Sequence, residues 1–305
     1  MESPGTSTGK MRIYSLREVV NDTSKPPPQI VGDGILLDGT LLMIYGSAKA
    51  GKSFLAANLG LAIAAKKDFA GFKIESSQRV LNLSAEGGYH PNRQRLRVMT
   101  RGMDRGHLDN FFVCFDSRLI LTDAEDFAAL DKVLTDLSPG VLVIDPLVRF
   151  HHAKENEAGE MARVFECIHR IKSDHDLSVI LVHHTGKNGA AGPRGSSVIS
   201  GEYDTGIELA RGVNGHRLIF DTRHVEAPPD RFVKFDPNTL WFDVSDQDFV
   251  ARIVAAKGGC QKRDLVQAII SEGSIKTPGG AYKAIQKSEE QGNIVVQDGL
   301  VLRKN

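Results

Sequence analysis

The chain has 305 residues, of which 41% are apolar and 25% are charged, as in an ordinary soluble globular protein with room for one large domain and one small one. Its 38 basic and 38 acidic side chains cancel, so any contact with nucleic acid must come from local basic patches. The cysteines are too far apart for a disulfide framework or a zinc knot, and no apolar run is long enough to span a bilayer. With no apolar signal region near Met1, we expect a cytoplasmic protein that does not contact membranes.

The amino-terminal segment, residues 1–30, is polar and ends in three consecutive prolines, Pro26, Pro27 and Pro28. Three prolines in a row exclude a helix and a central strand at that point. We therefore expect a flexible arm, which lies on the surface of this chain or of a neighbouring subunit.

Short apolar runs then alternate with helical patterns, which is typical of an α/β sheet covered on both faces. The predicted buried strands are residues 41–45, 80–84, 111–115, 141–144 and 179–182. The predicted helices are 53–66, a helix opened by a capping box of Thr122 and Glu125, and 161–171. Three or four shorter strands, around 204–210, 216–223, 231–236 and 240–244, are predicted to add an antiparallel edge to a parallel sheet. Together these elements assign residues 31–245 to one α/β domain.

The carboxyl-terminal segment, residues 246–305, differs in composition and is predicted to form a small winged-helix domain. Its predicted elements are helices over 247–257, over 262–271 and from Thr277-Pro278, then a hairpin on Asp298-Gly299. The residues that favour DNA binding by the third helix are Lys276, Tyr282, Lys283 and Lys287. Glu289 and Glu290 oppose it, and winged helices also dock proteins, so DNA and protein are both open as partners.

The first chemical motif is G-x-x-x-x-G-K-S, which lies between an apolar run and a helical pattern. Its members are Gly46, Ser47, Ala48, Lys49, Ala50, Gly51, Lys52 and Ser53, with Phe54 next. In such a loop the glycines let backbone N–H groups face phosphates, Lys52 neutralises the β- and γ-phosphates, and Ser53 binds Mg²⁺. The sequence therefore predicts that this segment, Phe54 included, binds ATP and Mg²⁺.

Two acidic residues follow other predicted strands. Asp145 ends the strand 141–144 and is predicted to hold Mg²⁺ or a water bound to it, although an aspartate there can also cap a helix. Glu86 follows the strand 80–84, where a carboxylate can orient and polarise an attacking water. The pattern alone leaves open whether Glu86 is catalytic or an exposed loop residue.

Two histidines, His183 and His184, end the strand 179–182. A polar residue at this position can contact the γ-phosphate and report its presence to the loop that follows. A histidine pair also raises the question of a metal site, but adjacent residues on a strand point to opposite faces, so we do not expect one.

A glycine-rich segment, residues 186–197, follows the histidines and carries Lys187 and Arg194. We expect a loop that responds to nucleotide or DNA, against the alternative of a plain surface loop. An arginine that reaches a neighbour's nucleotide couples the subunits of many oligomeric ATPases. Arg223 and Arg194 are both candidates for that role, and one sequence does not decide between them.

The order of these motifs resembles the RecA-like ATPases, in particular the RepA-like hexameric helicases of plasmids and related plasmid and phage AAA-type ATPases. The segments that carry the resemblance are GSAKAGKS, LSAEGG, VLVIDPLVRFHHAKENEAGEMARVF, VILVHHTGK and PRGSSVISG, within about residues 30–240. The resemblance implies a RecA-like P-loop core, a ring or filament of subunits, and ATP sites between subunits. Residues 257–305 have no counterpart in the compact plasmid helicases.

The resemblance also implies roles for individual residues. The implied catalytic residues are Lys52, Glu86, Asp145, His184 and Arg194. Among them Glu86 is the implied base, His184 the implied γ-phosphate sensor with His183 as its alternative, and Arg194 the implied arginine finger in trans. Ser53 and Asp145 are the implied Mg²⁺ residues.

The favoured function is a DNA-dependent ATPase, acting as a hexameric helicase in plasmid, phage or mobile-element replication. Loops around 151–159 and 186–197 are then expected to grip single-stranded DNA through phosphate contacts, so affinity falls with salt. The residues expected to make these contacts are Lys154, Lys187 and Arg194. The alternative is a recombination mediator or regulatory ATPase that binds DNA or a protein without unwinding, which the lack of an aromatic stacking residue in 186–197 favours. Glu86 and Asp145 argue against a scaffold that does not hydrolyse ATP.

Overall fold

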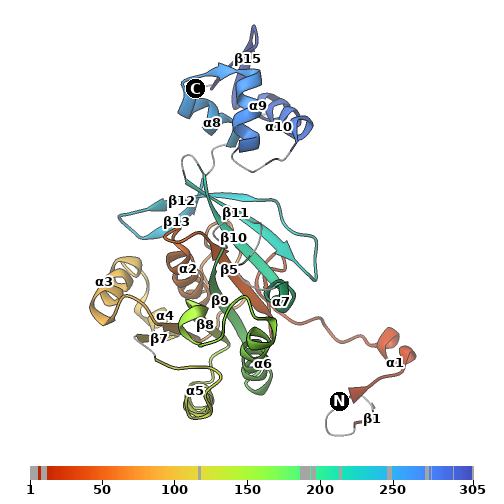
Figure 1. The fold of residues 1–305 in the computed structure, drawn as a ribbon, viewed down its shortest axis with the longest axis vertical. Helices are drawn as coiled ribbons and strands as arrows, with labels where there is room; N and C mark the ends of the chain where they lie inside the picture. The colour runs from red at the N-terminus through yellow and green to blue at the C-terminus, as the bar shows by residue number, and fades with distance from the viewer. Residues whose placement is uncertain are drawn as a thin grey trace.

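The fold is built around one nine-stranded mixed sheet (Figure 1). The computed structural model describes residues 6–7, 12–115, 118–185, 193, 197–212, 215–245, 249–271, 275, 277–290 and 292–303. The strand order is β13-β12-β11-β10-β5-β9-β8-β6-β7. The strands are β5 (Leu41–Gly46), β6 (Val80–Ser84), β7 (Phe111–Phe115), β8 (Val141–Asp145), β9 (Ser178–His184), β10 (Thr205–Gly212), β11 (Gly215–Thr222), β12 (Arg231–Asp236) and β13 (Trp241–Val244). The α/β expectation is confirmed.

Helices cover both faces of this sheet. They are α2 (Lys52–Ala65), α3 (Tyr89–Met99), α4 (Arg105–Leu108), α5 (Ala124–Leu137), the 3-10 helix η1 (Leu147–Arg149), α6 (Ala158–Asp174) and α7 (Ser197–Glu202). Strand β5 shows why its sequence is continuously apolar: Leu42 and Ile44 pack in the cluster that contains α2, while Leu41 and Met43 pack in the cluster that contains α5 and α6. A strand buried on both faces has no position for a polar side chain until it ends.

The parallel strands end together, which places the predicted site residues at one edge. In the register of the sheet Ser84 lies opposite Asp145, and Gly46 lies opposite His184. Polar loops at the carboxyl ends of parallel strands form the usual ligand crevice of an α/β sheet.

Two details of the fold differ from the sequence predictions. Strand β10 is antiparallel on one side only: it pairs in parallel with β5 and antiparallel with β11, after which β12 and β13 continue the antiparallel edge. Helix α5 is not capped by Thr122: the Asp123 carboxylate accepts from the backbone N–H groups of Glu125 and Asp126 at 3.0 and 3.1 Å. An aspartate satisfies two free N–H groups and adds negative charge at the helix start.

The carboxyl-terminal segment has its own apolar core and a three-stranded sheet of order β14-β16-β15. Its elements are α8 (Phe249–Lys257), β14 (Cys260–Gln261), α9 (Lys262–Ser271), α10 (Pro278–Glu290), β15 (Ile294–Gln297) and β16 (Leu300–Arg303). Thr277 caps α10 as predicted, its hydroxyl accepting from the N–H of Gly280 at 3.2 Å, while Lys276 lies outside the described residues. Three helices and a terminal hairpin suit the winged-helix assignment, which stays a prediction, as do the domain boundaries.

The amino-terminal segment contains short strands and one short helix that we did not predict from its sequence. Short strands β1 (Thr6–Ser7) and β2 (Arg12–Ile13) precede the six-residue helix α1 (Leu16–Asn21), and β3 (Gln29–Val31) pairs with β4 (Leu36–Leu37). A capping box between Ser15 and Glu18 starts α1, which buries no residue. Figure 1 shows an extended linker between α1 and the sheet. Among the described residues no helix combines the length and apolar content needed to cross a bilayer.

Candidate nucleotide-binding site

The loop between β5 and α2 has two positions that only glycine fits well. A Cβ on Gly46 would lie 2.6 Å from the carbonyl oxygen of Leu209 on β10, a distance that no side chain tolerates. Gly51 has a φ of +101°, and a Cβ there would lie 3.0 Å from the ring of Phe242 on β13. The loop is therefore pressed against the late strands of the sheet, with its backbone free to turn toward a ligand.

Lys52 opens α2 and turns its amine back across this loop. Its Nζ donates to the carbonyl oxygens of Gly46 and Ser47 at 3.0 and 2.9 Å, and lies 3.1 Å from Nδ1 of His184. Burial lowers the pKa of Lys52, while Asp145 and Glu86 act in the opposite direction. The cation is thus held close enough to both acidic site residues to sense their charge.

Ser53 and Asp145 are brought together as the sequence predicts. The Ser53 hydroxyl donates to Oδ1 of Asp145 at 3.0 Å, across 92 positions of sequence. Burial raises the pKa of Asp145 to about 6, against the lowering effect of the bond from Ser53. A hydroxyl and a carboxylate are oxygen ligands of the kind Mg²⁺ prefers, and a buried carboxylate gains most from a cation beside it. The pair fits a magnesium site.

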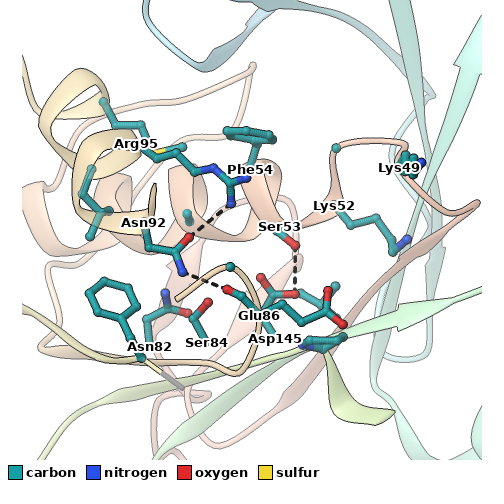
Figure 2. Close-up of a pocket in the computed structure, with 18 of the residues that line it drawn as sticks. Lys49, Lys52, Ser53, Phe54, Asn82, Ser84, Glu86, Asn92, Arg95 and Asp145 are labelled. Carbon is teal, nitrogen blue, oxygen red and sulfur yellow. Dashed lines mark hydrogen bonds between the residues drawn. The ribbon is translucent and has the colours of Figure 1, made fainter. Parts of the chain in front are cut away.

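Glu86 lies in the loop after β6 and lines the same cavity (Figure 2). Its backbone carbonyl accepts from Nδ2 of Asn92 at 2.8 Å, and its carboxylate accepts from Nε of Arg149 at 3.0 Å. The charge of Glu86 acts on the pKa of both Asp145 and Lys52. A second carboxylate therefore belongs to the same electrostatic site as the lysine and the aspartate.

The two histidines point in different directions, as expected for neighbours on a strand. His184 lines the cavity beside Lys52, and burial, followed by the charge of Lys52, lowers its pKa. His183 is fully buried, with Nδ1 3.9 Å from Oε1 of Glu155. Of the two candidates for a γ-phosphate sensor, only His184 faces the site.

The cavity, of about 450 Å³, continues beyond these residues into a chamber that the sequence did not predict. Polar residues from β6 and α3 line it, together with the ring of Phe54 (Figure 2). They are Asn82, Ser84, Asn92 and Arg95. Arg95 lies 5.3 Å from the Phe54 ring and donates to Asn92 at 3.1 Å. The sequence does contain one indication of this chamber: the polar residues Asn82 and Ser84 stand at alternate positions of β6, which is otherwise apolar.

The arginine candidates are placed differently. Arg223 lies at the opposite edge of the sheet, where it donates to the carbonyl of Gly201 and lies 3.7 Å from Oδ1 of Asp204, so it does not contact this chain's own nucleotide site. Its role toward a neighbour's nucleotide stays a prediction. Arg194 lies outside the described residues, as do Lys187 and most of 186–197. An arginine that was not predicted, Arg211 on β10, donates to the carbonyl of Lys49 in the phosphate-binding loop.

Comparison with known proteins gives matches in sequence. A family model described as an AAA domain matches residues 12–190. The chain is also similar to the DNA repair and recombination protein RadB of Thermococcus kodakarensis, with 24% identity over 163 residues, covering 52% of this chain and 67% of that protein. RadB of Pyrococcus abyssi is 22% identical over 208 residues, covering 68% of this chain and 76% of that protein.

Solved structures give matches in fold. The crystal structure of the RadB recombinase superposes with a TM-score of 0.50 at 18% identity, covering 68% of this chain and 92% of that one. A second solved structure, described as an ATPase domain, superposes with a TM-score of 0.53 at 15% identity, covering 68% of this chain and 86% of that one. At these identities the likeness shows the fold, and the predicted RecA-like P-loop core is confirmed.

Proposed function

The chain belongs to the AAA domain family, and we propose on this basis that it is a Mg²⁺-dependent ATP hydrolase whose turnover is coupled to single-stranded DNA. The proposal extends to a hexameric ring that unwinds DNA in plasmid, phage or mobile-element replication. One observation carries the hydrolase part: Lys52, Ser53, Glu86 and Asp145, from three separate segments, line one cavity. Binding alone would not need the carboxylate of Glu86 there.

The proposed reaction assigns one task to each of these residues. Lys52 and the loop amides bind the β- and γ-phosphates, and Ser53 and Asp145 hold Mg²⁺, which neutralises the charge on the phosphates. Glu86 orients a water whose oxygen attacks the γ-phosphorus as the bond to the β-phosphate oxygen breaks. The water proton passes to Glu86 and then to solvent, leaving ADP and phosphate. His184, beside Lys52, is proposed to sense the γ-phosphate.

The proposed coupling to DNA draws on the comparisons and on one exposed loop. The similar proteins include one described as a DNA repair and recombination protein and one described as an ATPase domain. The loop after η1 exposes Lys154, which we propose to contact backbone phosphates. Helicase action is proposed from the motif order, in which DPLVRF and the histidine pair resemble plasmid helicases.

The test is ATP turnover by the full chain with and without a single-stranded oligonucleotide, beside mass measurement with and without nucleotide. We expect turnover that single-stranded DNA increases and a hexamer with bound nucleotide. Lys52→Ala removes binding of Mg·ATP, and Lys132→Ala, on the exposed surface of α5, serves as its matched control. Absence of turnover in the wild-type chain, with nucleotide bound, would contradict the hydrolase proposal.

A second candidate function is a recombination mediator or regulatory ATPase that binds DNA without unwinding it. The observation that favours it is the sequence similarity to RadB over 68% of the chain. A strand-displacement assay separates the two. Stimulated turnover without displacement favours the mediator, and displacement that requires ATP favours the helicase.

The carboxyl-terminal segment is proposed to be a winged-helix domain that adds a second contact. On α10 the exposed residues include Tyr282, Lys283 and Lys287, but also Glu289 and Glu290. Binding of duplex DNA by the chain before and after Lys283→Glu with Lys287→Glu tests DNA against protein as its partner. Unchanged DNA binding favours protein docking.

A further inference from the structure

One face of β6 changes from apolar to polar along the strand. Val80 packs in the cluster that contains α2, and side chains two positions apart on a strand share a face, so Asn82 and Ser84 face α2 as well. Helix and strand are in close contact at Val80, where a Cβ on Gly60 would lie 3.4 Å from the Val80 side chain. One helical turn earlier on α2 stands Ala57, and here the cavity opens, lined by Ala57, Asn82 and Ser84.

The two polar side chains of this face are buried without a partner. Asn82 is 7% exposed and Ser84 is 9% exposed, and both line the cavity. Within the part of the chain that the structure describes, neither side chain forms a hydrogen bond. A carboxamide can donate two hydrogen bonds and accept others, and native proteins rarely leave such a group buried and unpaired. Asn82 therefore points to a ligand.

The chamber around Asn82 has walls that are held in place. Asn92, near the start of α3, donates to the carbonyl of Glu86 at 2.8 Å, and the carbonyl of Met99, at the end of α3, accepts from Nε1 of Trp241 at 2.8 Å. The other walls are largely apolar and include Phe54, Leu96 and Phe115 (Figure 2). A few polar groups among apolar walls are typical of a preformed site for a small molecule.

Under the proposed function, the chamber lies beyond the γ-phosphate end of the bound ATP. Glu86 acts at the γ-phosphate, and its backbone carbonyl is held by Asn92 of the chamber wall. The chamber strands β6 and β7 lie on one side of β5, which leads into the phosphate-binding loop, and β10 to β13 lie on the other side. Because the adenine is at the opposite end of the triphosphate, the chamber is left for a second molecule.

We propose that this chamber binds the purine base of a second molecule, a nucleoside, beside the bound ATP. Asn82 and Ser84 bind the edge of the base, because a carboxamide donates and accepts at once and so matches adjacent donor and acceptor atoms of a base. Two positions on a strand are about 7 Å apart, which suits a two-ring base. The ring of Phe54 offers the base an aromatic surface to stack on. This inference rests on the proposed function, which sets the direction of the ATP.

The experiment is calorimetric titration of the full chain, saturated with Mg·ADP, with adenosine and with guanosine. The variants are the wild type, Asn82→Leu, and Asn156→Ala as a control at an exposed loop position. One of the two nucleosides should bind the wild type at about one molecule per chain, and ribose should not bind. Asn82→Leu should weaken this binding by about tenfold or more, the effect of losing the hydrogen bonds of one side chain. Asn156→Ala should bind as the wild type does.

Thermal unfolding without nucleoside gives a second, independent measurement. Leucine has nearly the size of asparagine and needs no hydrogen-bond partner, so Asn82→Leu should melt at a higher temperature than the wild type. A residue kept for packing would behave in the opposite way. A gain in melting temperature together with a loss of nucleoside binding is therefore the result that identifies Asn82 as a ligand-binding residue.

Several results would overturn the proposal. They are no binding of either nucleoside to the Mg·ADP-saturated wild type, equal binding by Asn82→Leu, and a lower melting temperature of Asn82→Leu. Weaker binding of Mg·ADP itself by Asn82→Leu would mean that the base of the bound nucleotide occupies the chamber. If the wild type binds no Mg·ADP, the proposed function fails, and the same titrations of the nucleotide-free chain still decide whether Asn82 binds a nucleoside.

Discussion

Lys52 and His184 share one hydrogen bond in the site, with Nζ and Nδ1 separated by 3.1 Å. An ammonium has three protons, and Lys52 directs the other two at the carbonyls of Gly46 and Ser47. Nδ1 of His184 is therefore the acceptor, and the imidazole is neutral with its proton on Nε2. Under the proposed function, a phosphate that drew the ammonium away would free Nδ1, and His184 would sense that the site is filled.

This pairing predicts the effect of replacing His184. His184→Ala should lower kcat by about tenfold or more, because it removes the polar group beside Lys52, where the γ-phosphate is proposed to bind. The KM for ATP should change little. His184→Gln should retain more activity, since its amide can both accept and donate. If His184→Ala kept the wild-type kcat, His184 would have no part in the mechanism.

In buffer without Mg²⁺, the buried and ionised carboxylate of Asp145 should lower the free energy of unfolding. Its pKa of about 6 lies above the ordinary value of 3.8, so its contribution to stability is present below pH 3.8 and is lost as pH rises through about 6. Asp145→Asn keeps an acceptor for Ser53 and should raise the free energy of unfolding by about 1–3 kcal/mol at pH 8. Chemical denaturation checks this, and the gain should shrink at pH 5. An Asp145→Asn protein less stable than the wild type at pH 8 would contradict the assignment.

The same shift predicts how activity responds to pH. Asp145 must be ionised to hold Mg²⁺, so kcat/KM for Mg·ATP should fall as pH drops through about 6. Burial, followed by the charge of Lys52, lowers the pKa of His184, so protonation of this imidazole is shifted to more acidic pH. Nucleotide binding measured without Mg²⁺ is the control, and it should not show the acid loss. If kcat/KM for Mg·ATP stayed constant down to pH 5, that result would argue against Asp145 as a metal ligand.

Asn58 should be a strong determinant of stability although it lies outside the site. It is fully buried in α2, donates to the carbonyl of Leu240 at 3.1 Å and accepts from the N–H of Phe242 at 3.2 Å. Asn58→Ala leaves both backbone groups without their partner and should cost about 2–4 kcal/mol in urea denaturation. Asn156→Ala, at an exposed loop position, should change stability by less than about 0.5 kcal/mol.

The parts of the site that could be predicted are those whose chemistry is local in sequence. The loop around Lys52 needs its glycines, lysine and serine at fixed spacing, and Asp145 needs only to follow the most apolar strand. The sheet then brings Ser53 and Asp145 together, because Ser53 follows β5, Asp145 ends β8, and the two parallel strands end at the same edge. The two faces of each buried strand likewise follow from a continuous apolar run.

The parts that could not be predicted depend on how distant side chains meet. The pairing of Arg149 with Glu86 spans 63 positions, and no periodicity encodes it. Asn92 and Arg95 lie on a helix, α3, whose mean composition is too polar to be recognised as an amphipathic element. Arg223 follows β11, which runs antiparallel to β10, so it lies away from this chain's own nucleotide site, and its role toward a neighbour's nucleotide stays a prediction.

The close approach of Gly46 to the carbonyl of Leu209 indicates how much of the chain is needed to shape the loop between β5 and α2. The family match stops at residue 190, yet the wall behind the phosphate-binding loop comes from Leu209 on β10 and Phe242 on β13. A fragment trimmed to the matched region would carry the lysine, serine and both carboxylates and lack the backing that shapes the loop. We therefore expect that a truncated chain keeps its nucleotide site only if β10 and β13 are retained.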